Sequence, residues 1–239
     1  MAFGLERRAN LKVSIDMSDQ KSKENRETLE DKKRRTRRVI ARLKKAFPDV
    51  KCSLSHENPL QLLIATILSA QCTDERVNAV TPALFARFRT AQDFAGAEVE
   101  EIEDYVRSTG FFRNKAKHIR ACCETLTRDH GGAVPKDLEA LTQLAGVGRK
   151  TANVVMGNAF GIASGVVVDT HVRRITNRLG LTQRQDPEKI EQDLIEIVPK
   201  KDWVDFSHLL IHHGRKTCDA RRPDCPACPV RADCPSKQA

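Results

Sequence analysis

Helical periodicity recurs along almost the whole chain, and this pattern constrains the fold more than any other feature. Apolar residues follow an amphipathic helical spacing in the segments 39–47, 60–70, 74–80, 82–88, 99–107, 115–127, 137–144, 150–159, 170–179, 187–198 and 203–213. The segment 60–70 has scarcely any polar position, which predicts a central, buried helix. One strand-like run, 166–168, is too short and isolated to found a sheet. The sequence therefore predicts an all-α fold.

The charge balance favours a polyanionic partner. The chain has 41 Lys and Arg residues against 32 Asp and Glu residues, a formal net charge of +9, which attracts nucleic acid or an acidic membrane surface. Aromatic residues make up 5% of the chain, which argues against a single-strand binder built on stacking platforms. No run approaches the roughly 18 to 20 apolar residues of a membrane span. Double-stranded DNA or structured RNA is therefore the expected partner, and no membrane association is expected.

Residues 1–38 contain charges throughout and almost no periodic apolar positions. This composition predicts a disordered basic tail, and the lack of an apolar signal-peptide core predicts a cytoplasmic protein. A solvated tail is the favoured interpretation. The alternative is attraction of phosphates by its basic residues, namely Lys32, Lys33, Arg34, Arg35, Arg37 and Arg38.

Four cysteines gather near the C-terminus with the spacing C-x6-C-x2-C-x5-C, namely Cys218, Cys225, Cys228 and Cys234. Four thiolates suit either a zinc ion or a 4Fe-4S cluster, because both take soft sulfur ligands. Zinc ribbons usually have two C-x2-C pairs, whereas this segment has one, and three of its cysteines precede a proline as in ferredoxin-type sequences. The spacing therefore favours the 4Fe-4S cluster, with zinc as the alternative. The other cysteines are predicted to be small buried residues, namely Cys52, Cys72, Cys122 and Cys123.

A glycine hairpin, Gly146-Val147-Gly148, separates two of the helical segments. The two glycines allow a positive φ and close backbone approach, so the N–H groups that open the next helix can bind a phosphate oxygen. An ordinary tight turn is the alternative. The neighbouring Arg149 favours the phosphate.

Lys150 and Asp169 are the candidate chemical groups. A lysine at the start of a helix is disfavoured as a cation by the helix dipole, and a neutral amine is a nucleophile able to form a Schiff base. A solvated or phosphate-binding lysine is the alternative. Asp169 precedes a helical segment and is predicted to cap it. A capped carboxylate also stays rigid and ionised, as a stabiliser of a cation must.

Several motifs occur in order within residues 34–235. They are Leu-Ser-Ala-Gln-Cys-Thr-Asp at 68–74, Leu-Ala-Gly-Val-Gly-Arg-Lys at 144–150, Val-Asp-Thr-His at 168–171 and the C-terminal cysteine spacing. Together these residues resemble the endonuclease III branch of the helix-hairpin-helix DNA glycosylases. The departures are small, since Ala145 stands where proline is usual and one extra residue lies between Lys150 and Asp169.

The resemblance implies two all-α lobes with a DNA-binding cleft between them. Residues 52–163 would form a six-helix barrel that contains the helix-hairpin-helix motif. Residues 34–51 and 164–239 would form a 4Fe-4S cluster domain. Residues 1–33 have no counterpart in the family, and their composition predicts a disordered basic tail. The resemblance also implies that the protein acts as a monomer.

The resemblance further implies base excision repair of oxidised pyrimidines in double-stranded DNA. Lys150 would be the nucleophile at C1′ of the damaged nucleotide, and Asp169 would be the carboxylate that assists base departure. The resulting Schiff base would allow β-elimination at the abasic site. The hairpin 146–149 would hold a DNA phosphate.

Gln71 and Phe111 would fill the space that the flipped nucleotide leaves. An exposed Phe111 suits this role, since apolar wedges can hold a base stack open. The family commonly has leucine at the position of Phe111. A core phenylalanine is therefore the alternative there, and Phe112 could exchange roles with it.

Two other functions use many of the same residues. The adenine glycosylase branch shares the hairpin, the aspartate and the cluster, but it typically lacks the hairpin lysine and has a further C-terminal domain. Lys150 is present here, and five residues follow Cys234. A non-enzymatic DNA-binding or redox-sensing protein would leave Lys150 and Asp169 without a shared role. The favoured prediction is therefore a DNA glycosylase with lyase activity.

Overall fold

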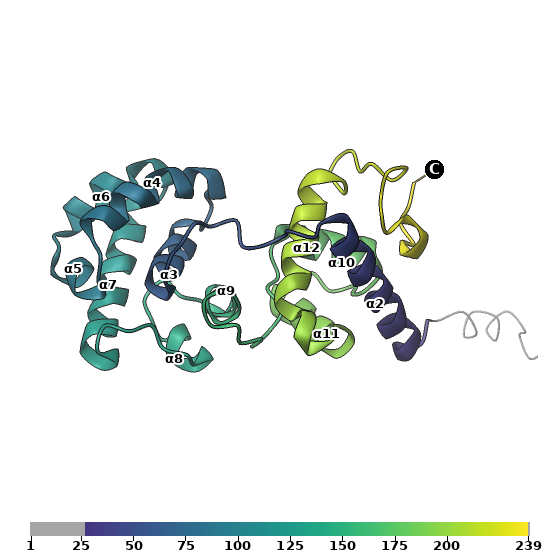
Figure 1. The fold of residues 1–239 in the computed structure, drawn as a ribbon, viewed down its shortest axis with the longest axis horizontal. Coiled ribbons are helices and arrows are strands. Elements are labelled where there is room, and N and C mark those ends of the chain that lie inside the picture. The colour runs from purple at the N-terminus through teal and green to yellow at the C-terminus, as the bar shows by residue number, and fades with distance from the viewer. Residues whose placement is uncertain (1–26, 239) are drawn as a thin grey trace, which may run out of the picture.

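The computed structural model describes residues 27–238, and every regular element in this range is a helix (Figure 1). The α-helices are α2 (Leu29–Ala46), α3 (Pro59–Leu68), α4 (Asp74–Arg87), α5 (Ala91–Gly96), α6 (Val99–Val106), α7 (Phe112–His130), α8 (Leu138–Thr142), α9 (Arg149–Phe160), α10 (Thr170–Arg178), α11 (Pro187–Ile197) and α12 (Trp203–Lys216). Short 3-10 helices are η1 (Arg107–Thr109), η2 (Lys200–Asp202) and η3 (Arg231–Asp233). The predicted all-α fold is confirmed. None of the helices within 27–238 is long and apolar enough to cross a membrane.

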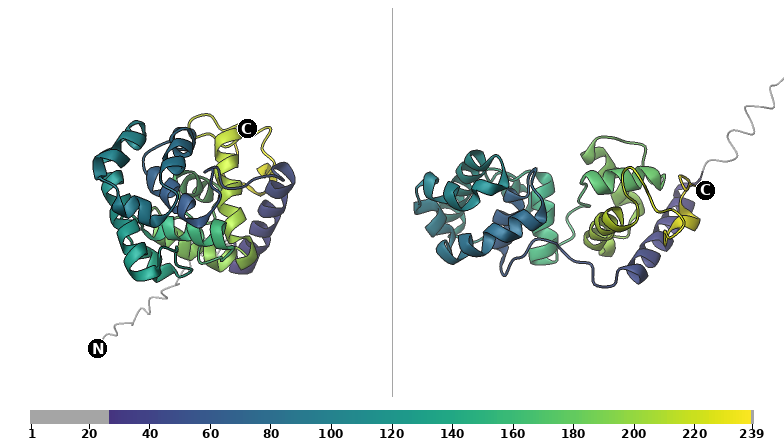
Figure 2. Two further views of the ribbon diagram at one scale, coloured as in Figure 1. Left: turned by 60° about the vertical axis from the view of Figure 1, so that its left-hand side comes forward. Right: turned by 90° about the horizontal axis from the view of Figure 1, so that it is seen from above.

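The helices form two lobes, each with its own hydrophobic core. Helices α3 to α9 surround one core, whose buried members lie within 54–156. Helix α2 and helices α10 to α12 surround the second core, whose buried members lie within 39–43 and 166–230. Figure 1 separates the two groups from left to right, and the view from above in Figure 2 shows the same division. The predicted two-lobe fold is confirmed, whereas the boundaries at residues 52 and 163 stay a prediction.

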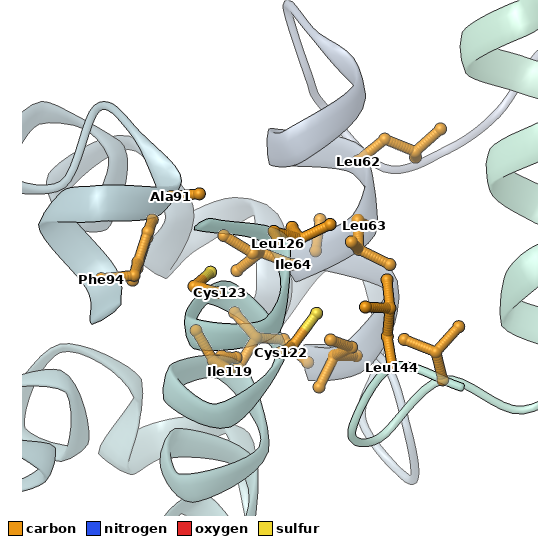
Figure 3. Packing of buried hydrophobic residues seen from close by; sticks show 14 of the residues in the cluster. Leu62, Leu63, Ile64, Ala91, Phe94, Ile119, Cys122, Cys123, Leu126 and Leu144 are labelled. Atoms are coloured by element: carbon orange, nitrogen blue, oxygen red, sulfur yellow. The ribbon is translucent and has the colours of Figure 1, made fainter. Parts of the chain in front are cut away.

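The predicted central helix is α3. Asn58 caps it by accepting a backbone hydrogen bond at 3.0 Å, and Pro59 occupies the first turn, where a missing N–H is harmless. Every residue from Leu62 to Leu68 is buried, and the helix packs against α7 (Figure 3). Full burial of each such leucine stabilises the lobe by about 1.5–3 kcal/mol.

The scattered cysteines belong to the first lobe. Cys122 and Cys123 of α7 are fully buried, as predicted, among the side chains drawn in Figure 3. Burial raises the pKa of Cys122 to about 12, so this thiol stays protonated and behaves as an apolar group. Cys52 and Cys72 are half-buried, which makes them less enclosed than the sequence predicts.

The first helix is longer than its apolar pattern predicts. Helix α2 begins at Leu29, because Thr28 caps it and acidic side chains occupy its first turn. Apolar periodicity misses this part of the helix, since capping and charge rather than core packing stabilise it. The predicted tail of residues 1–33 therefore extends too far. Residues 1–26 of that tail lie outside the described residues.

Two further elements differ from the prediction. Helix α4 runs through Pro82 as one helix where the sequence pattern predicts two. Burial of Val77 and Leu84 outweighs the backbone hydrogen bond that the proline removes. Helix α5 is absent from the prediction because it is too short to show a period, and a capping box between Thr90 and Asp93 stabilises it.

Arginines of α2 join this helix to the last described segment. Arg38 Nε donates to Asp233 Oδ1 at 3.0 Å, and Arg42 lies 2.9 Å from the other oxygen of the same carboxylate. Arg35 donates to the backbone carbonyls of Leu179 at 2.6 Å and Asp233 at 3.2 Å. Arg35, Arg38 and Arg42 therefore act within the fold of the second lobe, a role that the interpretation of Arg35 and Arg38 as phosphate-attracting charges omits.

Candidate active site

The predicted hairpin lies between α8 and α9, and its backbone forms a tight turn. Gly146 has a φ of +75°, and a Cβ there would lie 2.9 Å from His118 Cβ, so glycine is required. Val147 is buried, and its N–H closes the turn by donating to the Leu144 carbonyl at 3.1 Å. Gly148 is the N-cap of α9 and has no side chain to bond the first N–H groups of the helix. Those groups are therefore open to an anion.

Lys150 and Asp169 line the same pocket between the two lobes. The pocket has a volume of about 140 Å³, and its other lining residues come mainly from α9, from α12 and from the segment that precedes α3. Lys150 is exposed in the first turn of α9, and Asp169 is half-buried directly before α10. The fold thus brings together the amine and the carboxylate that the sequence singles out.

Asp169 caps α10, as predicted. Its Oδ1 accepts a hydrogen bond from the Val172 N–H at 2.7 Å. Val166 and Val168 anchor the preceding segment in the second hydrophobic core. The carboxylate is therefore held on both sides, by the core before it and by the helix after it.

Arg149 pairs with a buried carboxylate of the second lobe. Its Nε lies 2.8 Å from Glu191 Oε2, and the Glu191 side chain is only 6% exposed. Glu191 Oε1 also accepts a hydrogen bond from Asn153 Nδ2 at 3.0 Å, and Ser164 Oγ donates to Asn153 Oδ1 at 2.8 Å. The hydrogen bond to Glu191 raises the pKa of Arg149. The guanidinium predicted to contact a phosphate is thus also part of a structural ion pair.

The pocket contains polar side chains that the sequence motifs do not assign. His208 of α12 is half-buried, its Nε2 lies 2.8 Å from Asn158 Oδ1 of α9, and burial lowers the pKa of His208. Arg215 of α12 lies 2.8 Å from Asp74 of α4. Asp74 belongs to the motif at 68–74, which could have suggested it, whereas His208 and Asn158 lie on helical segments with no distinctive local signal.

Gln71 and Phe111 share an unusual backbone conformation. Among residues 27–238 they are the two non-glycine residues with positive φ, at 52° and 47°. Both side chains are exposed, that of Phe111 at 64%. Strained backbone of this kind gathers at functional sites, where the surrounding structure maintains it. Phe112 is instead half-buried against the first core, so Phe111 is the solvent-exposed phenylalanine of the two.

The four C-terminal cysteines line one pocket together with His213. All four are half-buried and free of disulfides. Cys218 Sγ lies 3.3 Å from an Arg178 guanidinium nitrogen, and Cys228 Sγ lies 3.7 Å from His213 Nε2. Within 27–238, no three His, Cys, Asp or Glu side chains are placed as ligands of a single metal ion.

Comparison with protein families defines the class. Residues 64–200 match the HhH-GPD superfamily of base excision DNA repair proteins. This stretch runs from within α3 to the end of α11 and beyond, so it contains the hairpin, Lys150 and Asp169. The fold and the site are therefore those of a helix-hairpin-helix base excision DNA repair protein.

Individual relatives narrow this class. Endonuclease III of Synechocystis sp. is 53% identical over 208 residues, which cover 87% of this chain and 95% of the relative. Endonuclease III of Escherichia coli is 40% identical over 200 residues, which cover 84% of this chain and 94% of the relative. The chain belongs to the endonuclease III family. Its activity is thus that of a DNA glycosylase with abasic-site lyase activity.

Solved structures agree with this assignment. A non-covalent endonuclease III–DNA complex matches with a TM-score of 0.81 and 44% identity, covering 86% of this chain and 96% of that one. A trapped endonuclease III–DNA covalent intermediate matches with the same TM-score, identity and coverage. The similarity spans both lobes.

Proposed function

We propose that this protein removes oxidised pyrimidines from double-stranded DNA and then cleaves the abasic strand through a Schiff base on Lys150. The observation that carries the proposal is that Lys150, on α9 of the first lobe, and Asp169, directly before α10 of the second lobe, line one pocket between the lobes. An amine alone suits many roles. An amine beside a rigid carboxylate suits the capture of a sugar carbon that becomes positively charged.

Base release comes first in the proposed mechanism. The damaged nucleotide leaves the base stack and enters the pocket, since its glycosidic bond cannot be reached inside the duplex. As the bond between C1′ and the base breaks, positive charge develops on the sugar, and the Asp169 carboxylate stabilises it. The helix cap at Val172 keeps that carboxylate in place during the step.

Strand cleavage follows on the same sugar. The neutral Lys150 amine forms a bond to C1′ as the base departs. The base keeps the bonding electron pair and is protonated by solvent, and the nitrogen of the new bond holds the proton that the ring oxygen receives when the sugar ring opens. Opening of the sugar ring gives a protonated imine, which acidifies the C2′ hydrogen. Loss of that proton breaks the C3′–O bond, and the strand is cut on the 3′ side of the lesion.

The hairpin, the loop that carries Gln71 and the loop that carries Phe111 would position the DNA for this chemistry. The open N–H groups after Gly148 suit a backbone phosphate. Gln71 and Phe111 would enter the space left by the flipped nucleotide, and the exposure of both side chains supports this role. Nothing in the proposed mechanism requires a second copy of the chain, so we propose that the protein acts as a monomer, on the DNA of a bacterial cytoplasm.

We also propose that the four C-terminal cysteines hold a 4Fe-4S cluster. Their half-buried thiols surround a pocket rather than meeting at one point, which suits a cluster that distributes its ligands over four iron atoms. The cluster would supply structural cross-linking of the C-terminal loop. Iron and acid-labile sulfide analysis of the purified protein tests this, and stoichiometric zinc without sulfide would overturn it.

Borohydride trapping tests the proposed activity, because borohydride reduces an imine to a stable amine. The protein is incubated with duplex DNA that contains one oxidised pyrimidine, and the covalent complex is separated by size. Lys150→Ala should abolish the complex, whereas Lys45→Ala, which changes an exposed lysine on α2, should leave it unchanged. Tight duplex binding by the unaltered protein with neither base release nor trapping would instead favour a non-enzymatic DNA-binding protein.

A further inference from the structure

A buried lysine lies between the loops that carry Gln71 and Phe111. Lys115 is in the first turns of α7, and the residue is only 5% exposed. Its Nζ donates hydrogen bonds to the carbonyl oxygens of Leu68 and Thr109, both at 2.8 Å. Leu68 ends α3 and Thr109 ends η1. One ammonium group thus connects the ends of two helical elements.

The buried position of the Lys115 ammonium has both an electrostatic benefit and a desolvation cost. Carbonyl groups at the end of a helix lack partners within the helix and carry the negative end of its dipole, so a cation there is favourable. Burial of an ammonium is nevertheless costly, and desolvation lowers the pKa of Lys115. An apolar side chain would avoid that cost. The lysine therefore provides something that packing alone would not, namely two directed hydrogen bonds to separate elements.

Both bonded carbonyls immediately precede the exposed loops. Gln71 follows Leu68 by three residues, and Phe111 follows Thr109 by two. Gln71 and Phe111 are also the two strained non-glycine positions noted above. A strained conformation persists only where neighbouring structure holds it, and Lys115 fixes the chain just before each of these residues.

We propose that Lys115 is a positioning residue that holds Gln71 and Phe111 at a fixed separation, so that both side chains enter the DNA together as the damaged nucleotide leaves the stack. This inference rests on the proposed function, because it requires that a nucleotide be flipped. The role concerns opening of the base pair. It does not concern the bond-breaking steps at Lys150 and Asp169.

The effect of Lys115 on the rate of base excision should therefore depend on whether the lesion is base-paired. A paired lesion must be separated from its partner and the gap must be filled, whereas an unpaired lesion leaves the stack at less cost. Loss of the two hydrogen bonds should slow excision of a paired lesion much more than excision of an unpaired one. A general loss of structure would slow both alike.

The experiment compares single-turnover base release by Lys115→Met on two duplexes. One has the oxidised pyrimidine opposite its normal partner base, and the other has it opposite a tetrahydrofuran spacer that carries no base. We expect release from the paired duplex to fall about tenfold and release from the spacer duplex to fall less than about threefold. Lys45→Met, which removes one exposed ammonium from α2, controls for the change in net charge.

A second background tests whether Lys115 acts through the two loops. In a Gln71→Ala and Phe111→Ala double variant, the further change Lys115→Met should have little additional effect on the paired duplex, since residues that act as one unit are not additive. Should Lys115→Met fail to fold, as judged by circular dichroism, Lys115→Gln keeps one amide donor and should show the same selectivity for paired lesions with a smaller loss.

The outcomes separate the two proposals. No base release by the unaltered protein from either duplex would refute the proposed function. Normal release by the unaltered protein together with equal losses on both duplexes, or with no loss, in the folded Lys115 variant would overturn the positioning role alone. A loss in the triple variant as large as in Lys115→Met itself would also overturn it.

Discussion

Arg149 and Glu191 form an ion pair that joins the two lobes, with Arg149 Nε 2.8 Å from Glu191 Oε2. Arg149 is the first residue of α9 and directly precedes Lys150, while Glu191 lies on α11. The pair therefore helps to fix where the beginning of α9 lies relative to the second lobe. Because Asp169 belongs to that second lobe, the same contact helps to set the relative position of the amine and the carboxylate.

Glu191→Gln should weaken this connection. The neutral amide can still accept the hydrogen bond from Asn153, but it loses the charge that attracts Arg149, so we expect destabilisation on the order of 1 kcal/mol. Urea unfolding measures that change. Borohydride trapping at saturating DNA should also become slower, because the lysine is held less firmly. Glu196→Gln, an exposed position on the same helix, should alter neither, and an equal effect of both changes would contradict the special role of Glu191.

The two hairpin glycines should respond differently to alanine. Gly146→Ala places a Cβ 2.9 Å from His118 Cβ at a φ of +75°, so we expect about 1–3 kcal/mol of destabilisation. Gly148→Ala meets nothing within 4 Å and has no unfavourable φ, so the protein should lose no more than about 1 kcal/mol of stability, the cost of alanine at an N-cap. The affinity of this variant for undamaged duplex should nevertheless fall, since a methyl group beside the open N–H groups of α9 would hinder a phosphate that binds there. Thermal unfolding and fluorescence anisotropy separate the two effects, and unchanged affinity in Gly148→Ala would argue for a plain turn.

Asp169 combines a structural role and a chemical one, and two substitutions distinguish them. Asparagine is as good an N-cap as aspartate, so Asp169→Asn should keep the stability of the protein while base release slows strongly. Asp169→Ala should lose base release and about 0.5–2 kcal/mol of stability as well. The measurements are single-turnover base release and urea unfolding. Normal base release by folded Asp169→Asn would remove the carboxylate from the mechanism.

Stability should decrease as the pH falls below neutrality. Burial lowers the pKa of His208 from its ordinary value of 6.5, so the unfolded chain binds a proton that the folded chain does not. The stabilising contribution is complete above about pH 6.5 and is lost as the pH falls toward the lowered pKa. Urea midpoints at about pH 7.5 and about pH 5.5 measure the change. His208→Gln should reduce the difference, and an unchanged difference would contradict the assignment.

Much of the fold follows from local patterns in the sequence. Helix α3 is predictable because Asn58 and Pro59 mark its start and its apolar run is nearly continuous. The start of α2 and the whole of α5 are not predictable from periodicity, because capping by Thr28 and by Thr90 stabilises them rather than a long apolar face. Pro82 would normally end a helix, and it is tolerated because burial of α4 on both sides of it outweighs one lost hydrogen bond.

The site likewise contains some residues that local sequence patterns predict and others that they do not. Sequence motifs single out Lys150 and Asp169, the proposed catalytic groups, because each stands at a helix start with a distinctive neighbourhood. Motifs do not reveal Glu191 or His208, since their partners Arg149 and Asn158 lie 42 and 50 residues away and meet them only in the folded chain. Lys115 is a further case, because its significance lies in two backbone carbonyls, which leave no mark in the sequence.

The arginines of α2 mean that the second lobe can be completed only after its late segments have been synthesised. Arg35 bonds to a backbone carbonyl 198 residues later, so early and late parts of the chain must meet before this lobe is complete. On the ribosome, residues up to the end of α9 can gather into the first lobe while the partners of α2 are still unmade. The hairpin and Lys150 are then in place before the lobe that contains Asp169 closes, so the proposed repair site is complete only after Asp233 has been made.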